Sequence, residues 1–156
     1  MASDGIRLDS TQREVILGEL ANLLARPLPP AVRESHENLK QYVEGNLDVP
    51  SDLEVPLAMM IEASIMSGNA RRFGAGVRQS MVALFEKTRP GKAIAQSIAA
   101  VNSALSQTGS HTIETISATL RAPGCYAMTL KTDQLQMVIV FDRTGLSIES
   151  LEVNLG

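Results

Sequence analysis

Two carboxylates in the sequence are candidates for a general base. Asp142 shares a predicted strand face with Val138 and Val140, where loss of solvent would raise its pKa toward the range that proton transfer requires. Glu62 is an isolated acid in an otherwise apolar helical pattern, although most acids placed in this way face solvent. A structural role is the favoured interpretation of Asp142, because it opens the turn 142–145, where an aspartate usually bonds the backbone ahead of it.

Cys125 and Tyr126 begin a predicted strand and could stand at the rim of a pocket. A nucleophilic cysteine needs a nearby base or cation that stabilises its thiolate. The two histidines are His36 and His111, and only His111 could approach Cys125, if the strand register allowed it. A small buried hydrophobic residue is therefore the favoured interpretation of Cys125. Tyr126 is kept as a hydrogen-bond donor that could assist a pocket carboxylate.

Metal and phosphate motifs are missing from the sequence, so we expect no cofactor. The two histidines and the single cysteine lie far apart along the chain. Gly74 and Gly76 lie between helical segments instead of following a strand, as a phosphate-binding loop would require. Basic residues dominate the segment 71–92, for which a solvated helix face is the favoured interpretation. The alternatives are a site for a phosphate or an acidic ligand, or a contact with the acidic N-terminal segment of the same or another chain.

Methionine is the natural filler of a core that has few aromatic residues. Aromatics make up 3% of the chain and tryptophan is absent, so the core must be largely aliphatic. A methionine-lined cavity would suit a small apolar ligand. The candidate ligand-binding residues are Met60, Met81, Tyr126, Met128 and Met137.

Length and composition describe an ordinary soluble globular protein. The 156 residues suffice for one core, and 20% charged residues with a net charge of −3 give no bias toward nucleic acid or membranes. A single cysteine excludes an internal disulfide and fits a reducing compartment. Neither a secretory signal nor an apolar run of about 20 residues is evident, so a cytoplasmic location is expected.

Hydrophobic periodicity divides the chain into helices followed by strands. Helical spacing predicts helices over about 9–26 and 31–44, a buried helix from Ser51 to the residue before Gly68, and further helices up to Gly109. Thr11 and Glu14 are read as the capping box of the first helix. We expect residues 1–50 to form a helical arm and 51–156 an α+β domain.

After Ser110 the period changes to two and predicts four strands, at about 111–121, 125–131, 135–142 and 146–154. Short turns between them imply an antiparallel meander, and a shift in the pattern near 149–150 predicts a β-bulge. The predicted fold is therefore α+β, with N-terminal helices packed on a curved C-terminal four-stranded meander that encloses a single hydrophobic interior.

The order of these features over about 55–153 resembles the nuclear-transport-factor-2-like superfamily, also called SnoaL-like or cystatin-like cone domains. The resemblance lies in a helix ending at Ser67-Gly68-Asn69, the later helix over 93–105, and the closing segment 138–146, VIVFDRTGL, which is similar to the end of uncharacterised members. It implies a cone with a pocket between sheet and helices, and frequent dimerisation through the outer sheet face. It implies no activity, and no residue here matches a catalytic position of the family.

Strong structural patterning without paired catalytic groups favours a non-catalytic domain. We expect it to bind a partner protein or a small apolar ligand and to form a homodimer, with 1–50 as a docking or swapping arm. The alternative is an isomerase- or hydratase-type enzyme that uses Asp142 or Glu62 as a general base. A third interpretation is an adaptor that buries the edge strand 111–121 against the sheet of another chain.

Overall fold

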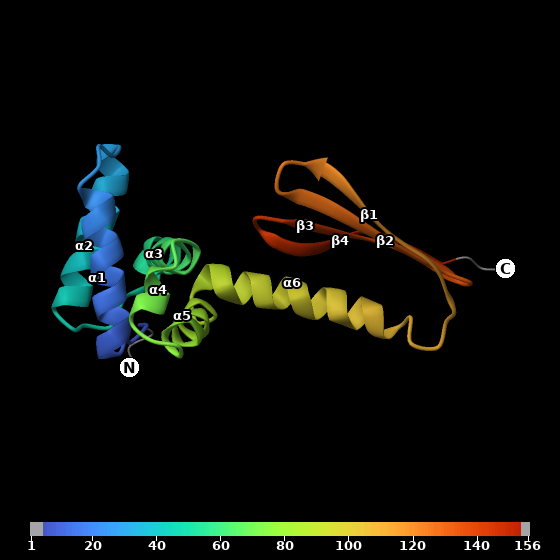
Figure 1. Ribbon diagram of the computed structural model, residues 1–156, viewed down its shortest axis with the longest axis horizontal. Coiled ribbons are helices and arrows are strands. Elements are labelled where there is room, and N and C mark those ends of the chain that lie inside the picture. The colour runs from blue at the N-terminus through green and yellow to red at the C-terminus, as the bar shows by residue number, and fades with distance from the viewer. Residues whose placement is uncertain (1–4, 154–156) are drawn as a thin grey trace. The chain divides into compact units, whose positions relative to one another are not determined.

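The computed structural model describes residues 5–153 and divides the chain after Lys92 into two compact units (Figure 1). The first, called the helical unit, contains α1 (Ser10–Leu24), α2 (Pro30–Glu44), the short 3-10 helix η1 (Ser51–Leu53), α3 (Glu54–Met66), α4 (Asn69–Arg72) and α5 (Val77–Phe85). Helix α6 (Arg89–Ser106) starts in the helical unit and continues into the second, called the sheet unit. The strands β1 (Ile113–Ala122), β2 (Cys125–Thr132), β3 (Leu135–Asp142) and β4 (Gly145–Val153) complete the sheet unit.

Helix α1 begins with a reciprocal capping box, two residues earlier than the sequence suggested. The Asp9 carboxylate accepts a hydrogen bond from the backbone N–H of Gln12 at 2.8 Å, and the Gln12 side chain accepts one from the backbone N–H of Asp9 at 2.9 Å. The predicted box of Thr11 and Glu14 is therefore wrong. Asp9 has the extended backbone that an N-cap requires, whereas Thr11 already lies within the helix.

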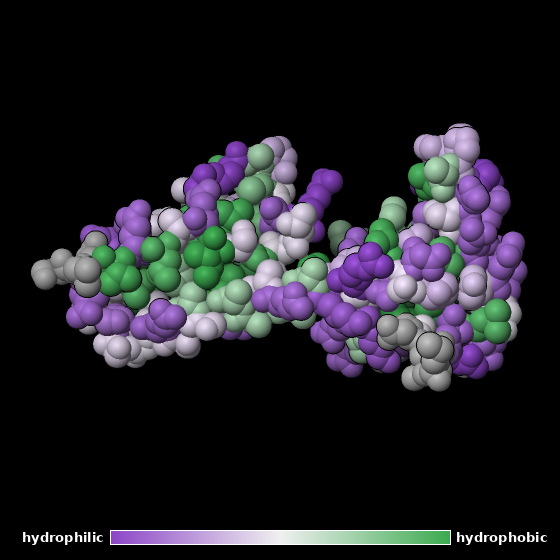
Figure 2. Space-filling model, turned by 180° about the vertical axis from the view of Figure 1, so that it is seen from behind, coloured by the Kyte–Doolittle hydropathy of each residue, from purple (hydrophilic) through white to green (hydrophobic). Residues whose placement is uncertain are grey.

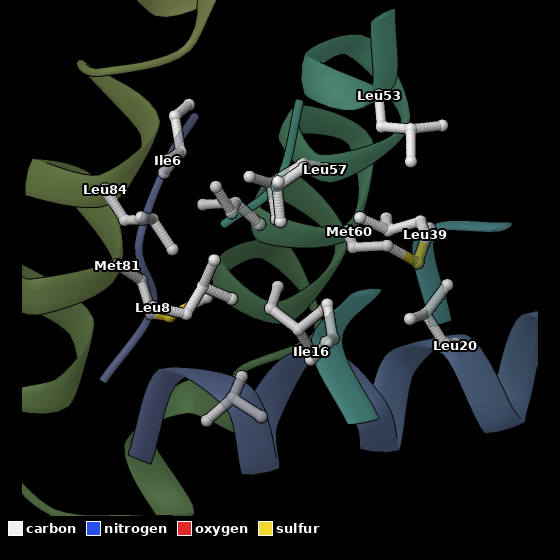
Figure 3. Packing of buried hydrophobic residues seen from close by; sticks show 14 of the residues in the cluster. Ile6, Leu8, Ile16, Leu20, Leu39, Leu53, Leu57, Met60, Met81 and Leu84 are labelled. Carbon is white, nitrogen blue, oxygen red and sulfur yellow. The ribbon is translucent and has the colours of Figure 1, made fainter. Parts of the chain in front are cut away.

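The hydrophobic core of the helical unit combines all of its longer helices. Figure 3 shows Ile16 and Leu20 of α1 facing Leu57 and Met60 of α3, with Leu39 of α2 beside them. The chain before α1 joins the same unit, because Ile6 and Val49 exchange two backbone hydrogen bonds of 2.8 and 2.9 Å. Residues before position 50 thus share one core with the residues that follow, which differs from the separate arm expected from the sequence.

The sheet unit is the antiparallel meander that the sequence predicted, with strand order β1-β2-β3-β4. The pairing of β3 with β4 shifts between Val138 and Ile139, whose partners are Ser150 and Ile148. Glu149 is therefore the extra residue of a β-bulge, which confirms the bulge predicted near 149–150. Helices followed by this sheet confirm the predicted α+β class.

The sheet is curled so that its two outer strands come within side-chain reach. In a flat sheet, β1 and β4 would lie about 14 Å apart, three strand spacings of about 4.8 Å. Arg121 of β1 and Glu149 of β4 nevertheless form an ion pair of 2.6 Å. The bulge at Glu149 bends β4, and a bend of this kind increases the curl.

One face of the sheet packs against the part of α6 that belongs to the sheet unit. Val101 and Ala104 of α6 form a buried cluster with alternate residues of β3, namely Leu135, Met137 and Ile139. Within residues 5–153, the buried hydrophobic residues therefore form two clusters, one in each unit, instead of the single interior that the sequence predicted. Apolar side chains of α1, α2, α3 and α5 pack against one another, and those of α6 pack against β3.

Candidate functional site

Asp142 holds the turn between β3 and β4 together. Its Oδ1 accepts hydrogen bonds from the Thr144 hydroxyl at 2.6 Å and the Thr144 backbone N–H at 2.7 Å. These bonds, with the side-chain bond contributing most, lower the pKa of the exposed Asp142 carboxyl below its ordinary value. The favoured structural interpretation is confirmed. The raised pKa that a general base would need is not found at Asp142.

Strand register keeps the other predicted catalytic side chains apart. Tyr126 is paired with Phe141, so Tyr126 and Asp142 point to opposite faces of the sheet. Cys125 is half-buried and lies beside Ala122 at one end of the β1–β2 hairpin, whereas His111 precedes the other end, where Ile113 meets Thr132. The register therefore gives Cys125 no contact with His111. Glu62 is exposed on α3, in the helical unit.

The predicted ligand-binding residues belong to different surroundings. Met60 and Met81 are buried in the core of the helical unit. Met137 is buried in the sheet unit, with Met128 packed against the same cluster, while Tyr126 is exposed. Each methionine thus fills a core, and the five residues do not line a common cavity.

An uncovered apolar surface follows β1, an outer strand of the sheet. All ten residues of β1 are exposed. Ile116 and Leu120 are 58% and 65% exposed, and Tyr126, which is paired with Leu120, is 52% exposed. Hydrophobic side chains also reach the surface of the sheet unit in the view of Figure 2, where this unit lies on the left. Outer strands with such surfaces are sites of pairing with other chains.

The exposed apolar side chains of β1 lie on the same sheet face that α6 covers at β3. Ile116 is paired with Leu130, which in turn is paired with Met137 of β3, and paired residues point to the same face. Helix α6 buries Met137 but leaves Ile116 exposed. The apolar face is therefore wider than the helix that packs on it.

The two edges of the sheet differ in how they are protected against pairing. β1 has register shifts only at its ends, and its regular centre, 115–120, carries no charge. The charged residues that flank this centre already form ion pairs, since Glu114 pairs with Lys131 at 3.0 Å and Arg121 pairs with Glu149. β4 instead carries Glu149 at a central bulge and a second acid close to its end. Bulges and charges at a sheet edge disfavour pairing with another strand, so β1 is the edge that can pair with another chain.

A second feature, not predicted from the sequence, is a hollow of about 260 Å³ between α1 and the region of α4. Its lining residues are Val15, Gly18, Glu19, Asn22, Asn69, Arg72 and Phe73. The α1 residues recur at helical spacing and so share one face of that helix. Glu19 and Asn22 also line a neighbouring hollow of about 210 Å³.

Glu19 is the buried charge at the centre of this region. It is 8% exposed, and its Oε1 accepts hydrogen bonds from the Asn69 amide at 2.6 Å and the Ser67 hydroxyl at 3.4 Å. The signal in the sequence was an acid within the apolar stripe of Ile16 and Leu20. Carboxylates are rarely buried without a partner, so this position pointed to a polar site.

Gly18 is unusual because it lies in the middle of α1 without a packing reason. Glycine inside a helix costs about 1 kcal/mol relative to alanine. A Cβ at Gly18 would meet no atom within 4 Å. Packing therefore does not require the glycine, and its missing side chain leaves the hollow wider.

Comparison of the chain with protein-family models, with curated proteins and with solved structures finds no match. Among the described residues, no helix combines the length and the apolar character that a membrane span requires. Nowhere in residues 5–153 do three histidine, cysteine, aspartate or glutamate side chains gather as ligands for a metal ion.

Proposed function

We propose that the protein is a non-catalytic interaction module that forms a homodimer by pairing β1 with β1 of a second copy. The observation that carries this proposal is the uncharged and regular centre of β1, all of whose residues are exposed. Interaction is favoured over binding of a small apolar ligand, because the candidate methionines fill two cores and share no cavity.

The sequence of β1 is complementary to itself in one antiparallel register. Residues that face each other across a strand pair must lie on the same face, and two identical strands must pair about a two-fold axis. Centred on Ala118, such pairing places Ile116 opposite the partner's Leu120 and Ala118 opposite the partner's Ala118. Both are contacts between small or apolar side chains of the uncovered face.

The same register is compatible with the polar face. Arg121 lies opposite the partner's Thr115, and Ser117 lies opposite the partner's Thr119, so no like charges meet. Pairs of this kind are neutral or favourable across strands. Backbone hydrogen bonds along the paired edges would join two four-stranded sheets into one of eight strands. The cone-domain resemblance implies dimers formed through the outer sheet face, which is a different interface from the edge pairing proposed here.

Ala118→Lys tests the proposal because only residue 118 faces itself in this register. We expect the wild-type protein to have twice the chain mass of 16.8 kDa in light scattering, and Ala118→Lys to have the mass of one chain. Two opposed lysines repel each other and leave no partner to compensate their charge. Ser147→Lys, at an exposed position of β4, is the matched control and should remain dimeric.

Circular dichroism would establish that both variants are folded. A wild-type protein that stays at 16.8 kDa at all concentrations would overturn the proposal. A folded Ala118→Lys variant that keeps the wild-type dimer mass would overturn the β1 register.

A further inference from the structure

We propose that the hollow between α1 and α4 binds a small zwitterion, an α-amino acid with an apolar side chain. This inference concerns the helical unit and does not depend on pairing of β1. It is carried by three properties of the hollow: a carboxylate with one acceptor oxygen that receives no hydrogen bond from the described residues, an arginine in the lining, and the apolar lining residues Val15 and Phe73.

The carboxylate of Glu19 is prepared to receive an ammonium group. Asn69 and Ser67 both donate to Oε1, which fixes the orientation of the side chain. Among the described residues, no group donates a hydrogen bond to Oε2. Oε2 is not among the buried atoms without a partner, so it is accessible from the hollow, where a ligand ammonium could donate to it in place of water. The site thus has a place for a positively charged nitrogen.

Arg72 supplies the opposite charge. It lines the same hollow as Glu19 and forms no ion pair within residues 5–153. A guanidinium binds a carboxylate through two parallel hydrogen bonds, a geometry that lysine does not offer. One carboxylate and one guanidinium make the hollow neutral in sum, so a zwitterion fits its charges better than a simple cation or anion.

The rest of the lining sets the size and character of the ligand. Val15 and Phe73 are apolar and would contact a hydrocarbon side chain. A volume of about 260 Å³ lies below the roughly 300–1,000 Å³ typical of drug-sized ligands, and an amino acid is correspondingly small. The open space beside Gly18 is part of this hollow, because Gly18 lines it and no atom lies within 4 Å of the place where a Cβ would stand.

The direct test is a titration of the full-length, isotope-labelled protein with a panel of free L-amino acids, followed by amide NMR. We expect at least one aliphatic amino acid to shift the signals of Gly18, Asn22, Asn69 and Phe73 in a saturable way. Its N-acetyl and carboxamide derivatives each lose one charge and should bind at least about tenfold more weakly. If no amino acid shifts these signals, or if the derivatives bind equally well, the proposal is overturned.

Two variants and one control variant test whether binding occurs in this hollow. Gly18→Leu fills the open space and should abolish the shifts, whereas Ala21→Leu, at an exposed position of α1 outside the hollow, should leave them unchanged. Glu19→Gln keeps an acceptor for Asn69 but removes the charge, and should weaken binding by at least about tenfold. Unchanged affinity in both Gly18→Leu and Glu19→Gln would contradict the assignment. Because light scattering measures the dimer separately, failure of one proposal is distinguishable from failure of the other.

Discussion

At the scale of single residues, Asp142 shows how a turn can account for an acid that resembles a catalytic base. Its carboxylate is held by two hydrogen bonds from Thr144, and these lower its pKa. A carboxyl with a depressed folded-state pKa stabilises the fold above its unfolded pKa and loses that contribution as pH falls through the folded value. The stabilisation is therefore present at neutral pH and is lost under acidic conditions.

We expect an NMR titration to give Asp142 a pKa below that of an ordinary aspartate. In Thr144→Val, which lacks the hydroxyl donor, the value should move back toward the ordinary one, because the largest cause of the shift is removed. A pKa at or above the ordinary value in the wild-type protein would contradict this account and would revive the general-base hypothesis for Asp142.

Two helical glycines should respond in opposite directions to the same substitution. A Cβ at Gly91 would overlap the carbonyl oxygen of Phe85, whereas one at Gly18 would meet nothing within 4 Å. We expect Gly91→Ala to destabilise the protein by about 1–3 kcal/mol through overpacking. Gly18→Ala should instead stabilise it by about 0.5–1 kcal/mol, because alanine is the better helix former. Urea unfolding measures both changes, and destabilisation by Gly18→Ala would refute the description of an open hollow.

At the scale of secondary-structure elements, α3 has one side buried in the core of the helical unit and one side exposed to solvent. Leu57 is fully buried, whereas Met66 on the same helix is 86% exposed. We expect Leu57→Ala to cost about 2–5 kcal/mol, because it removes buried methyl groups and leaves a cavity. Met66→Ala should change the stability by no more than about 0.5 kcal/mol. Equal effects of the two substitutions in urea unfolding would show that α3 is oriented differently.

The strands were predicted closely because alternation and turn residues are local signals. β3 occupies 135–142 as expected, and the bulge at Glu149 was evident from the shift of the apolar pattern. Helix α2 was harder to predict. The spacing predicted a helix over about 31–44 but not what it packs against, and the structure shows that Leu39 and Val43 are buried. Which helix covers a given stripe depends on packing between distant segments, and periodicity within one segment does not record it.

At the scale of the whole molecule, the division into units was not predictable from composition. The sequence suggested a boundary at residue 50, where the charge balance changes and proline and glycine cluster. The structure divides after Lys92, within α6, because α1 and α2 share their core with α3 and α5. The site at Glu19 was missed for a related reason, since its partners Ser67 and Asn69 lie 48 and 50 residues away along the chain.

Pairing of β1 with a second copy is tested most directly by a register-specific disulfide. In a Cys125→Ala background, Ala118→Cys places two thiols opposite each other, with Cα atoms about 4.5–5.5 Å apart, a separation that a disulfide spans. Thr115→Cys is the control on the same strand, because its two copies would lie about 20 Å apart in this register. We expect mild oxidation to convert Ala118→Cys into a covalent dimer and to leave Thr115→Cys as separate chains. Equal cross-linking of both variants, or none at Ala118→Cys, would contradict the proposed dimer.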